Sequence, residues 1–303
     1  MPGETTRRTL IAAAVSLAAT TVVVVVKLIA AVSSGSVSVL AEGLQSTVDV
    51  LMSLLALVTI RYAAMPPDEE HPYGHGKAEL LAGAFQMILV LGSAAFILFE
   101  VGRRWRQTEA IAWDWAAMAM GYAVVSNLAV SAWIRKVARE TESPVLHSEV
   151  QHLNADTLTS VGVLAGLIVY GFTNLRWIDP LVAMLFTLWA IVAAGRQLRA
   201  VLHPLMDGAL PPVERRRLEE VLDAHPEVRG YHALKTRMIG AHRMVELHVM
   251  LDDALPFVQA HEIAEQIEKH LRDRLGNASV SIHYEPYEAE MAHRAREHGE
   301  SKN

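Results

Sequence analysis

Six long apolar runs occupy most of this chain up to about residue 203 and constrain its fold more than any other feature. Crossing about 30 Å of hydrocarbon takes roughly 20 apolar residues in a helix. Each run reaches that length, so we expect six transmembrane helices. Their approximate limits are 9–32, 37–61, 79–101, 112–135, 146–172 and 178–202.

The first run follows Arg7 and Arg8 and superficially resembles a secretory signal peptide. It is longer than the usual apolar region of such a peptide, and no clear small-residue cleavage site separates it from further apolar sequence. We therefore expect a retained membrane helix. For the sixth run, Asp179 followed by Pro180 predicts a helix start, with the aspartate as N-cap.

Basic residues predict the orientation, because cytoplasmic loops carry an excess of Lys and Arg. With the N-terminus inside, the inner side collects Arg7, Arg8, Arg61, Lys77, Arg135, Lys136, Arg139, Arg196 and Arg199. The outer side collects Arg103, Arg104, Arg106 and Arg176. The bias favours both termini in the cytoplasm.

Side chains of metal-ligand type lie inside the apolar runs. Asp49 is in the second run, and His152 and Asp156 are in the fifth. Such groups are costly in hydrocarbon unless they face a cavity, a partner or a metal. Gln45 precedes Asp49 by four residues, as His152 precedes Asp156, so each pair projects from one helix face. Facing each other, the two helices would offer a four-coordinate site for a divalent transition metal.

A structural role for these residues is the alternative. Lys27, deep in the first run, could pair with Asp49 or Asp156, or the carboxylates could bond between helices. Two carboxylates and a histidine at matching helical spacing are hard to explain in this way. Glu42 and Glu149 share the faces of the two pairs, and they either line an access route or lie at the membrane surface.

A second group of ligand types follows the second run. Asp68, His71 and His75 lie within eight residues. Pro72 and Gly74 prevent a regular helix there, so the loop is free to converge on one ion. The alternative is a solvated polar loop.

From about Asp207 onward the hydrophobic pattern differs from that of the six apolar runs. Glu214–Ala224 and Gln259–Leu275 have amphipathic helical patterns, whereas Met244–Leu251 alternates as a strand and Ala278–Tyr284 reads as another. The order helix, strand, strand, helix, strand predicts a small two-layer α+β domain related to the ferredoxin-like split βαβ fold.

The predicted organisation is therefore a six-helix membrane domain over 1–206, an α+β domain over 207–288 and a charged, disordered tail over 289–303. The net charge of -6 gives no basic surface suited to nucleic acid. The chain has no cysteine, which excludes disulfides and thiolate ligands and leaves 14 histidines as the main nitrogen ligands.

Several histidines fall in the predicted α+β domain. His283 and Glu285 share one strand face, and His248 lies on the face opposite the valine and leucine row. With His232 and His261 they form a possible third metal site, although spacing alone does not join them. The remaining histidines of this part are interpreted as ordinary surface residues: His225, His242, His270, His293 and His298.

Three motifs resemble the cation diffusion facilitator family, in particular its bacterial zinc and ferrous-iron exporters. They are Ser34-Gly35-Ser36-Val37-Ser38-Val39-Leu40-Ala41 leading to Asp49, His71-Pro72-Tyr73-Gly74-His75-Gly76-Lys77-Ala78-Glu79, and His152-Leu153-Asn154-Ala155-Asp156. The resemblance extends from the first helix through Glu285. It implies a homodimeric antiporter that exports a divalent metal against inward proton flow, with a metallochaperone-like cytoplasmic domain.

The resemblance also implies roles for individual residues. The transport site would comprise Gln45, Asp49, His152 and Asp156. A loop site would use Asp68, His71 and His75. A cytoplasmic site, binuclear in similar proteins, would use His232, His248, His261, His283 and Glu285. Lys77 and Asp207 resemble the charge interlock between membrane and cytoplasmic parts; the alternative is two unpaired interfacial charges.

Two positions depart from the family pattern. Gln45 stands where the zinc and iron exporters usually carry an acid, and Glu285 replaces an aspartate. A mixed oxygen and nitrogen site fits Zn²⁺ best, with Fe²⁺, Co²⁺, Ni²⁺ and Mn²⁺ open. The rival functions are a membrane-anchored metal sensor that does not translocate its ion and, less favoured, an intramembrane hydrolase. We expect no enzymatic activity.

Overall fold

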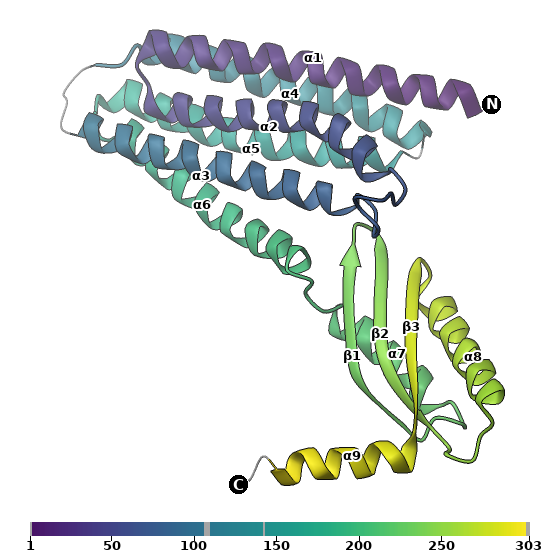
Figure 1. The fold of residues 1–303 in the computed structure, drawn as a ribbon. Helices are drawn as coiled ribbons and strands as arrows, with labels where there is room; N and C mark the ends of the chain where they lie inside the picture. Colours follow the sequence, from purple (N-terminus) through teal and green to yellow (C-terminus); the bar gives the residue numbers. More distant parts are fainter. Residues whose placement is uncertain (1, 106–109, 142, 301–303) are drawn as a thin grey trace. The chain divides into compact units, whose positions relative to one another are not determined.

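The computed structural model describes residues 2–105, 110–141 and 143–300 (Figure 1). Its contacts divide the chain into two compact units, which are described separately: Met1–Leu57 with Ala84–Leu198, and Val58–Gly83 with Arg199–Asn303. The second unit contains the loop after the second helix as well as the α+β domain.

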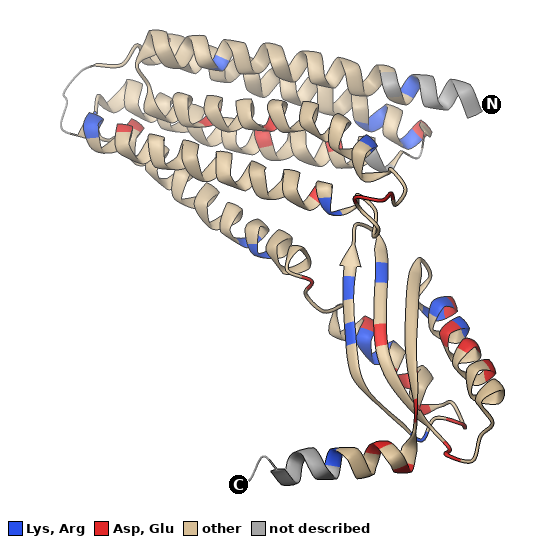
Figure 2. Ribbon diagram, viewed as in Figure 1, with Lys and Arg blue, Asp and Glu red and all other residues tan. Residues whose placement is uncertain are grey.

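Within the described residues, six long helices are present where six were predicted, and each is long and apolar enough to cross a membrane. A helix is the expected form because hydrocarbon offers no partner to backbone N–H and C=O groups. The helices are α1 (Pro2–Ser34), α2 (Val37–Ala63), α3 (Lys77–Trp105), α4 (Trp113–Thr141), α5 (Pro144–Thr173) and α6 (Ile178–Leu205). Figure 2 shows that their central stretches carry few charges. Arg106, which the orientation argument placed outside, is not among the described residues.

The core of the helical unit is built from small and medium-sized side chains. Ala30 and Ala31 of α1 and Ala116 and Ala119 of α4 belong to one buried cluster with Val163 of α5. Small residues let membrane helices approach closely, which is how such bundles gain packing energy.

Asp179 has a different role from the one predicted. It is already inside α6, and its carboxylate instead caps the start of α2. Oδ2 accepts a hydrogen bond from the Val37 backbone N–H at 2.8 Å, and Oδ1 accepts from the Ser36 and Ser38 hydroxyls at 2.6 and 2.5 Å. The first N–H groups of a helix lack internal partners, so a buried carboxylate there is well satisfied.

The α+β domain confirms the predicted order of elements, namely α7 (Pro212–Asp223), β1 (Gly230–Ile239), β2 (His242–Leu251), α8 (Phe257–Leu275) and β3 (Ala278–Pro286). The sheet order is β1-β2-β3, with β1 antiparallel and β3 parallel to β2. Val245, Leu247 and Val249 alternate onto the face that packs against Leu218 of α7 and Ile267 of α8. The alternate residues of β2 therefore point away from both helices.

The prediction of a disordered tail after residue 288 is wrong for the described part, which forms α9 (Tyr287–Glu300). Two local interactions support this helix. The Asp253 carboxylate accepts hydrogen bonds from the backbone N–H groups of Glu288 and Ala289, and Arg294 pairs with Glu290 at 2.8 Å one turn away. Residues 301–303 lie outside the described residues.

Candidate metal sites

Asp49 of α2 and His152 and Asp156 of α5 converge inside the helical unit. One ligand atom from each lies within 4.8 Å of the others. His152 Nε2 is 3.7 Å from Asp156 Oδ2, as expected for residues four apart on one helix. All three side chains are partly buried, and all three line one cavity.

The cavity has a volume of about 530 Å³ and is lined by the predicted ligand faces of both α2 and α5. Gln45 lines it together with the three converging residues, which places all four members of the predicted transport site around one cavity. Glu42 and Glu149 also line it, and Ser16 of α1 donates to Glu149 at 2.6 Å. The cavity wall is thus rich in oxygen ligands and contains one imidazole.

Lys27 does not neutralise the converging carboxylates by direct pairing. Its ammonium is 3.1 Å from Glu42 Oε1 and donates to the Ser46 hydroxyl at 3.1 Å. Ser160 of α5 donates a short hydrogen bond to the same Glu42 oxygen. Lys27 and Glu42 are each only 1% exposed, so this is a buried ion pair beside the cavity, and sequence patterning did not reveal it.

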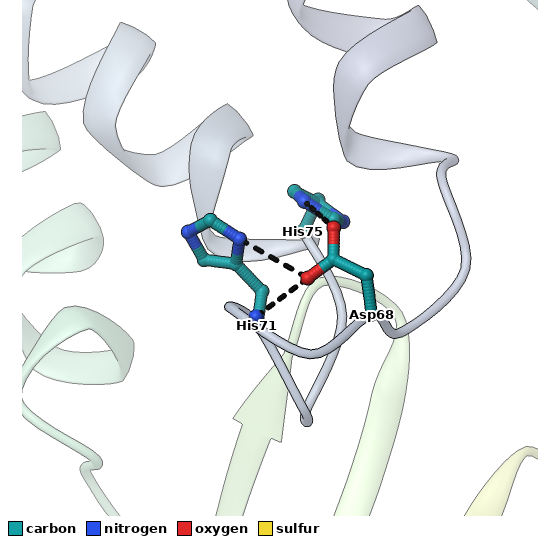
Figure 3. Close-up of side chains that lie close together, drawn as sticks. All are labelled: Asp68, His71 and His75. Atoms are coloured by element: carbon teal, nitrogen blue, oxygen red, sulfur yellow. Dashed lines mark hydrogen bonds and ion pairs between the residues drawn. The ribbon is translucent and has the colours of Figure 1, made fainter.

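The loop between α2 and α3 brings Asp68, His71 and His75 together (Figure 3). Asp68 Oδ1 is 3.4 Å from His71 Nδ1, and Asp68 Oδ2 is 3.3 Å from His75 Nε2. The two imidazole centroids are 4.6 Å apart. One carboxylate thus lies between two imidazoles, which is the arrangement that the spacing predicted.

Local hydrogen bonding orients this group before any ion binds. The His71 backbone N–H donates to Asp68 Oδ1 at 2.6 Å, and this bond, helped by the nearby imidazoles, holds the pKa of the Asp68 carboxyl below its ordinary value. His75 is buried and packs edge-on against Tyr62 at the end of α2, with ring centroids 4.6 Å apart. Tyr62 is a supporting residue that carried no recognisable sequence signal.

Asp68→Ala is expected to remove one bound zinc ion per chain from the purified full-length protein, because it deletes the carboxylate shared by both imidazoles. Asp68 is about half exposed, so stability should change little. Calorimetric titration in detergent measures the stoichiometry, and Glu70→Gln, in the same exposed loop, is the matched control. An unchanged stoichiometry in Asp68→Ala would rule out this site.

The sheet register brings three histidines of the α+β domain into one row. His232 of β1 is the partner of His248 of β2, which in turn is the partner of His283 of β3. Cross-strand partners lie about 5 Å apart, and the ring centroids of each neighbouring pair are 4.8 Å apart. The row lies on the sheet face that α7 and α8 leave uncovered.

Glu285 connects this row. His232 Nε2 donates to Glu285 Oε2 and His248 Nδ1 donates to Oε1, both at 2.8 Å, while His283 Nε2 is 3.4 Å from Oε1. Partial burial alone would raise the pKa of the Glu285 carboxyl, but the bonds from His232 and His248 outweigh it and the pKa lies below its ordinary value. Glutamate at this position therefore contacts all three histidines of the row.

His261 is not brought to the row. It lies on the exposed surface of α8 and pairs with Glu265 at 3.5 Å, whereas the histidine row is on the other sheet face. Glu290 of α9, in contrast, has an oxygen 3.7 Å from His232 Nε2. Sequence reasoning missed Glu290 because its segment was expected to be disordered.

Lys77 and Asp207 are paired. Lys77 Nζ donates to Asp207 Oδ1 at 2.9 Å, and Arg237 is 3.5 Å from the other oxygen. The hydrogen bond from Lys77, reinforced by Arg237, holds the pKa of Asp207 below its ordinary value. The alternative of two unpaired interfacial charges is therefore excluded.

Comparisons with known proteins match both parts of the chain to family models. Residues 13–206 match the family model described as the cation efflux transmembrane domain, and residues 210–287 match the model for the cation efflux protein cytoplasmic domain. The first match alone covers more than half of the chain.

Curated relatives are similar over nearly the whole length. The chain is 34% identical over 263 residues to the cation-efflux pump FieF of Serratia proteamaculans (strain 568), covering 86% of this chain and 87% of the relative. It is 35% identical over 265 residues to FieF of Yersinia pestis (strain Pestoides F), with the same coverage. The solved structure of CzrB in its Zn form matches 26% of this chain and 90% of its own, at 29% identity and a TM-score of 0.25.

Proposed function

This chain belongs to the cation efflux family, also called the cation diffusion facilitators, and from that premise we propose that it exports a divalent transition metal in exchange for protons. It is a multi-pass membrane protein that binds metal and acts in cation efflux. Zinc is the first candidate for the exported ion, and ferrous iron is the second.

One observation carries the proposal. Asp49, His152 and Asp156 lie in apolar helices, yet their ligand atoms converge within 4.8 Å around a cavity. Ionisable groups at that depth are expensive and are typical of ion and proton pathways. The structural alternative considered for them is pairing with Lys27, but the Lys27 ammonium is paired with Glu42.

Competition between metal and protons for the same atoms would couple metal export to proton movement. A metal ion needs neutral His152 and ionised Asp49 and Asp156, so binding it displaces protons from the same atoms. Imidazole changes charge readily near physiological pH. With the cavity open to the cytoplasm the metal displaces protons, and with it open to the other side protons displace the metal. Rocking of helices around a midplane site is the usual way to alternate access.

The α+β domain would bind metal in a regulatory role, separate from the exported ion. We propose that His232, His248, His283 and Glu285 hold a regulatory ion. The domain model that matches residues 210–287 carries the label ZT_dimer, which supports a homodimer assembled through this domain. We place the protein in the inner membrane, with both termini in the cytoplasm.

The test is transport by the purified protein in proteoliposomes with a pH-sensitive dye inside. Each divalent ion is added in turn, outside, at equal concentration. Metal-dependent proton movement with Zn²⁺, absent from protein-free vesicles, is the expected result. Binding without proton movement would favour the membrane-anchored sensor instead.

Gln45→Asp is expected to change metal selectivity by about tenfold or more between Zn²⁺ and at least one competing ion. It adds a negative charge to the cavity beside Asp49, and ligand charge and type set selectivity among divalent metals. The ratio of initial proton fluxes with Zn²⁺, Fe²⁺ and Co²⁺ measures it. Gln86→Glu, which adds a charge elsewhere on the same cavity wall, is the matched control; identical metal profiles for Gln45→Asp and the parent protein would exclude a selective role.

A further inference from the structure

The buried carboxylate of Glu42 joins α1, α2 and α5 beside the membrane cavity. Its Oε1 atom accepts hydrogen bonds from the Lys27 ammonium of α1 at 3.1 Å, from the Thr159 hydroxyl of α5 at 3.3 Å and from the Ser160 hydroxyl of α5. We call these four residues the Glu42 bridge. Lys27, Glu42 and Ser160 are each 1% exposed or less, so bulk water competes little for these bonds. Hydrogen bonds to a charged acceptor in such surroundings are strong.

The Glu42 bridge lies close to the converging metal ligands on both helices. On α2, Glu42 precedes Gln45 by three residues and Asp49 by seven, so these three residues share one helix face. On α5, Ser160 follows Asp156 by four residues, which is one helical turn. The bridge therefore joins α2 to α5 on the faces that carry the predicted ligands.

Thr159 connects the bridge to a ligand through the backbone. Its hydroxyl lies 2.9 Å from the Asp156 carbonyl oxygen as well as 3.3 Å from Glu42 Oε1. Thr159 and Glu42 both line the cavity that the ligands surround. A displacement of α5 away from α2 would therefore break the bonds at Glu42 and carry Asp156 away from Asp49.

A metal ion needs its ligands at fixed distances. Zinc lies about 2.0–2.2 Å from nitrogen and oxygen ligands, so side chains of α2 and α5 can share one ion only if the two helices keep a defined separation. The ligand atoms of Asp49, His152 and Asp156 already lie within 4.8 Å of one another. Residues that orient ligands without touching the ion typically contribute about 10- to 100-fold to metal affinity.

We propose that Glu42 is a positioning residue for the transport site. By holding α5 through Ser160 and Thr159, it keeps the ligands of α2 and α5 within reach of one divalent ion. This inference rests on the proposed function, because it assigns Glu42 a role in that same site. The Lys27 ammonium balances the charge of the Glu42 carboxylate, so Glu42 can position the helices without adding a net charge to the cavity.

The test deletes the hydrogen bonds between the two helices and leaves the ion pair intact. Thr159→Val combined with Ser160→Ala removes both α5 hydroxyls, while Lys27 and Glu42 stay paired. Calorimetric titration of the purified full-length protein in detergent measures zinc binding, and the component that Asp49→Ala lacks is assigned to the transport site. The dissociation constant of that component should rise about tenfold in the double variant, at the lower end of the usual range.

Thr157→Val is the matched control. Thr157 is buried in α5, but its hydroxyl donates to the Leu153 carbonyl oxygen of the same helix, so its loss does not loosen α5 from α2. The control should keep the dissociation constant of the parent protein. An unchanged dissociation constant in the double variant, or an equal rise in Thr157→Val, would overturn the proposal.

Proton flux in proteoliposomes separates this inference from the proposed function. Flux tests metal export, whereas the dissociation constant tests the Glu42 bridge. Zinc binding that depends on Asp49 without proton movement would refute exchange, and the dissociation constant of the double variant would still decide the role of Glu42. Flux in the parent protein with an unchanged dissociation constant in the double variant would refute the bridge alone. Absence of any zinc binding that depends on Asp49 would overturn both.

Discussion

Asp49→Ala is expected to reduce metal-driven proton flux in proteoliposomes by about 100-fold or more. Even partners outside the ligand shell typically cost 10- to 100-fold in metal affinity or activity when they are removed. Asp49 is the one carboxylate that α2 contributes to the three converging residues, so its loss leaves Gln45 as the only α2 ligand of the proposed site. It also removes one of the groups for which metal and protons compete.

The measurement is the initial rate of dye response after addition of Zn²⁺, at matched protein density in the vesicles. Asp114→Ala, which deletes an exposed acid at the start of α4, is the control and should retain flux close to that of the parent protein. Substantial residual flux in Asp49→Ala would count against the transport site as assigned.

Lys27→Met is expected to destabilise the protein by about 3–5 kcal/mol, the usual cost of removing one partner of a buried ion pair. Lys27 and Glu42 are each 1% exposed, and Glu42 Oε2 is buried without a hydrogen bond in the described structure. Without the ammonium, the Glu42 carboxylate would lose its charge partner in a nearly water-free environment. The midpoint of thermal unfolding, followed by size-exclusion chromatography in detergent, should fall by many degrees.

A double variant separates this electrostatic effect from a packing defect. Lys27→Met with Glu42→Gln removes both charges and should recover most of the lost stability, because replacing a whole buried pair is often nearly neutral. Lys136→Met, at an exposed position near the end of α4, should leave the midpoint unchanged. If the double variant is no more stable than Lys27→Met alone, the buried pair does not explain the loss.

Much of the architecture could be predicted because it depends on periodicity. Apolar runs of sufficient length predict membrane helices, and the alternation around Val245 and Leu247 predicts a strand with one buried face. The convergence of Asp49 with His152 and Asp156 followed from spacing of four residues on each helix, and the structure brings these residues together. Their role in transport stays a prediction.

Contacts between distant parts of the chain were harder to predict. Strand register decides that His232, His248 and His283 form a row, and register cannot be read from a single sequence whose turn types are unknown. Similarly, α9 depends on Asp253, more than thirty residues earlier, to satisfy its first N–H groups. Composition alone made this charged segment resemble a disordered one.

The carboxylate of Asp179 has a consequence for how the helical unit can move. Because it holds the first residues of α2 through several hydrogen bonds, at roughly 1.5–3 kcal/mol each for a charged acceptor, the starts of α2 and α6 cannot separate cheaply. Any motion that reorients Asp49 must therefore keep the starts of α2 and α6 together. The opposite ends of these two helices then move further. Cross-linking positions 36 and 179 should accordingly leave turnover intact, whereas a tether between the opposite ends should arrest it.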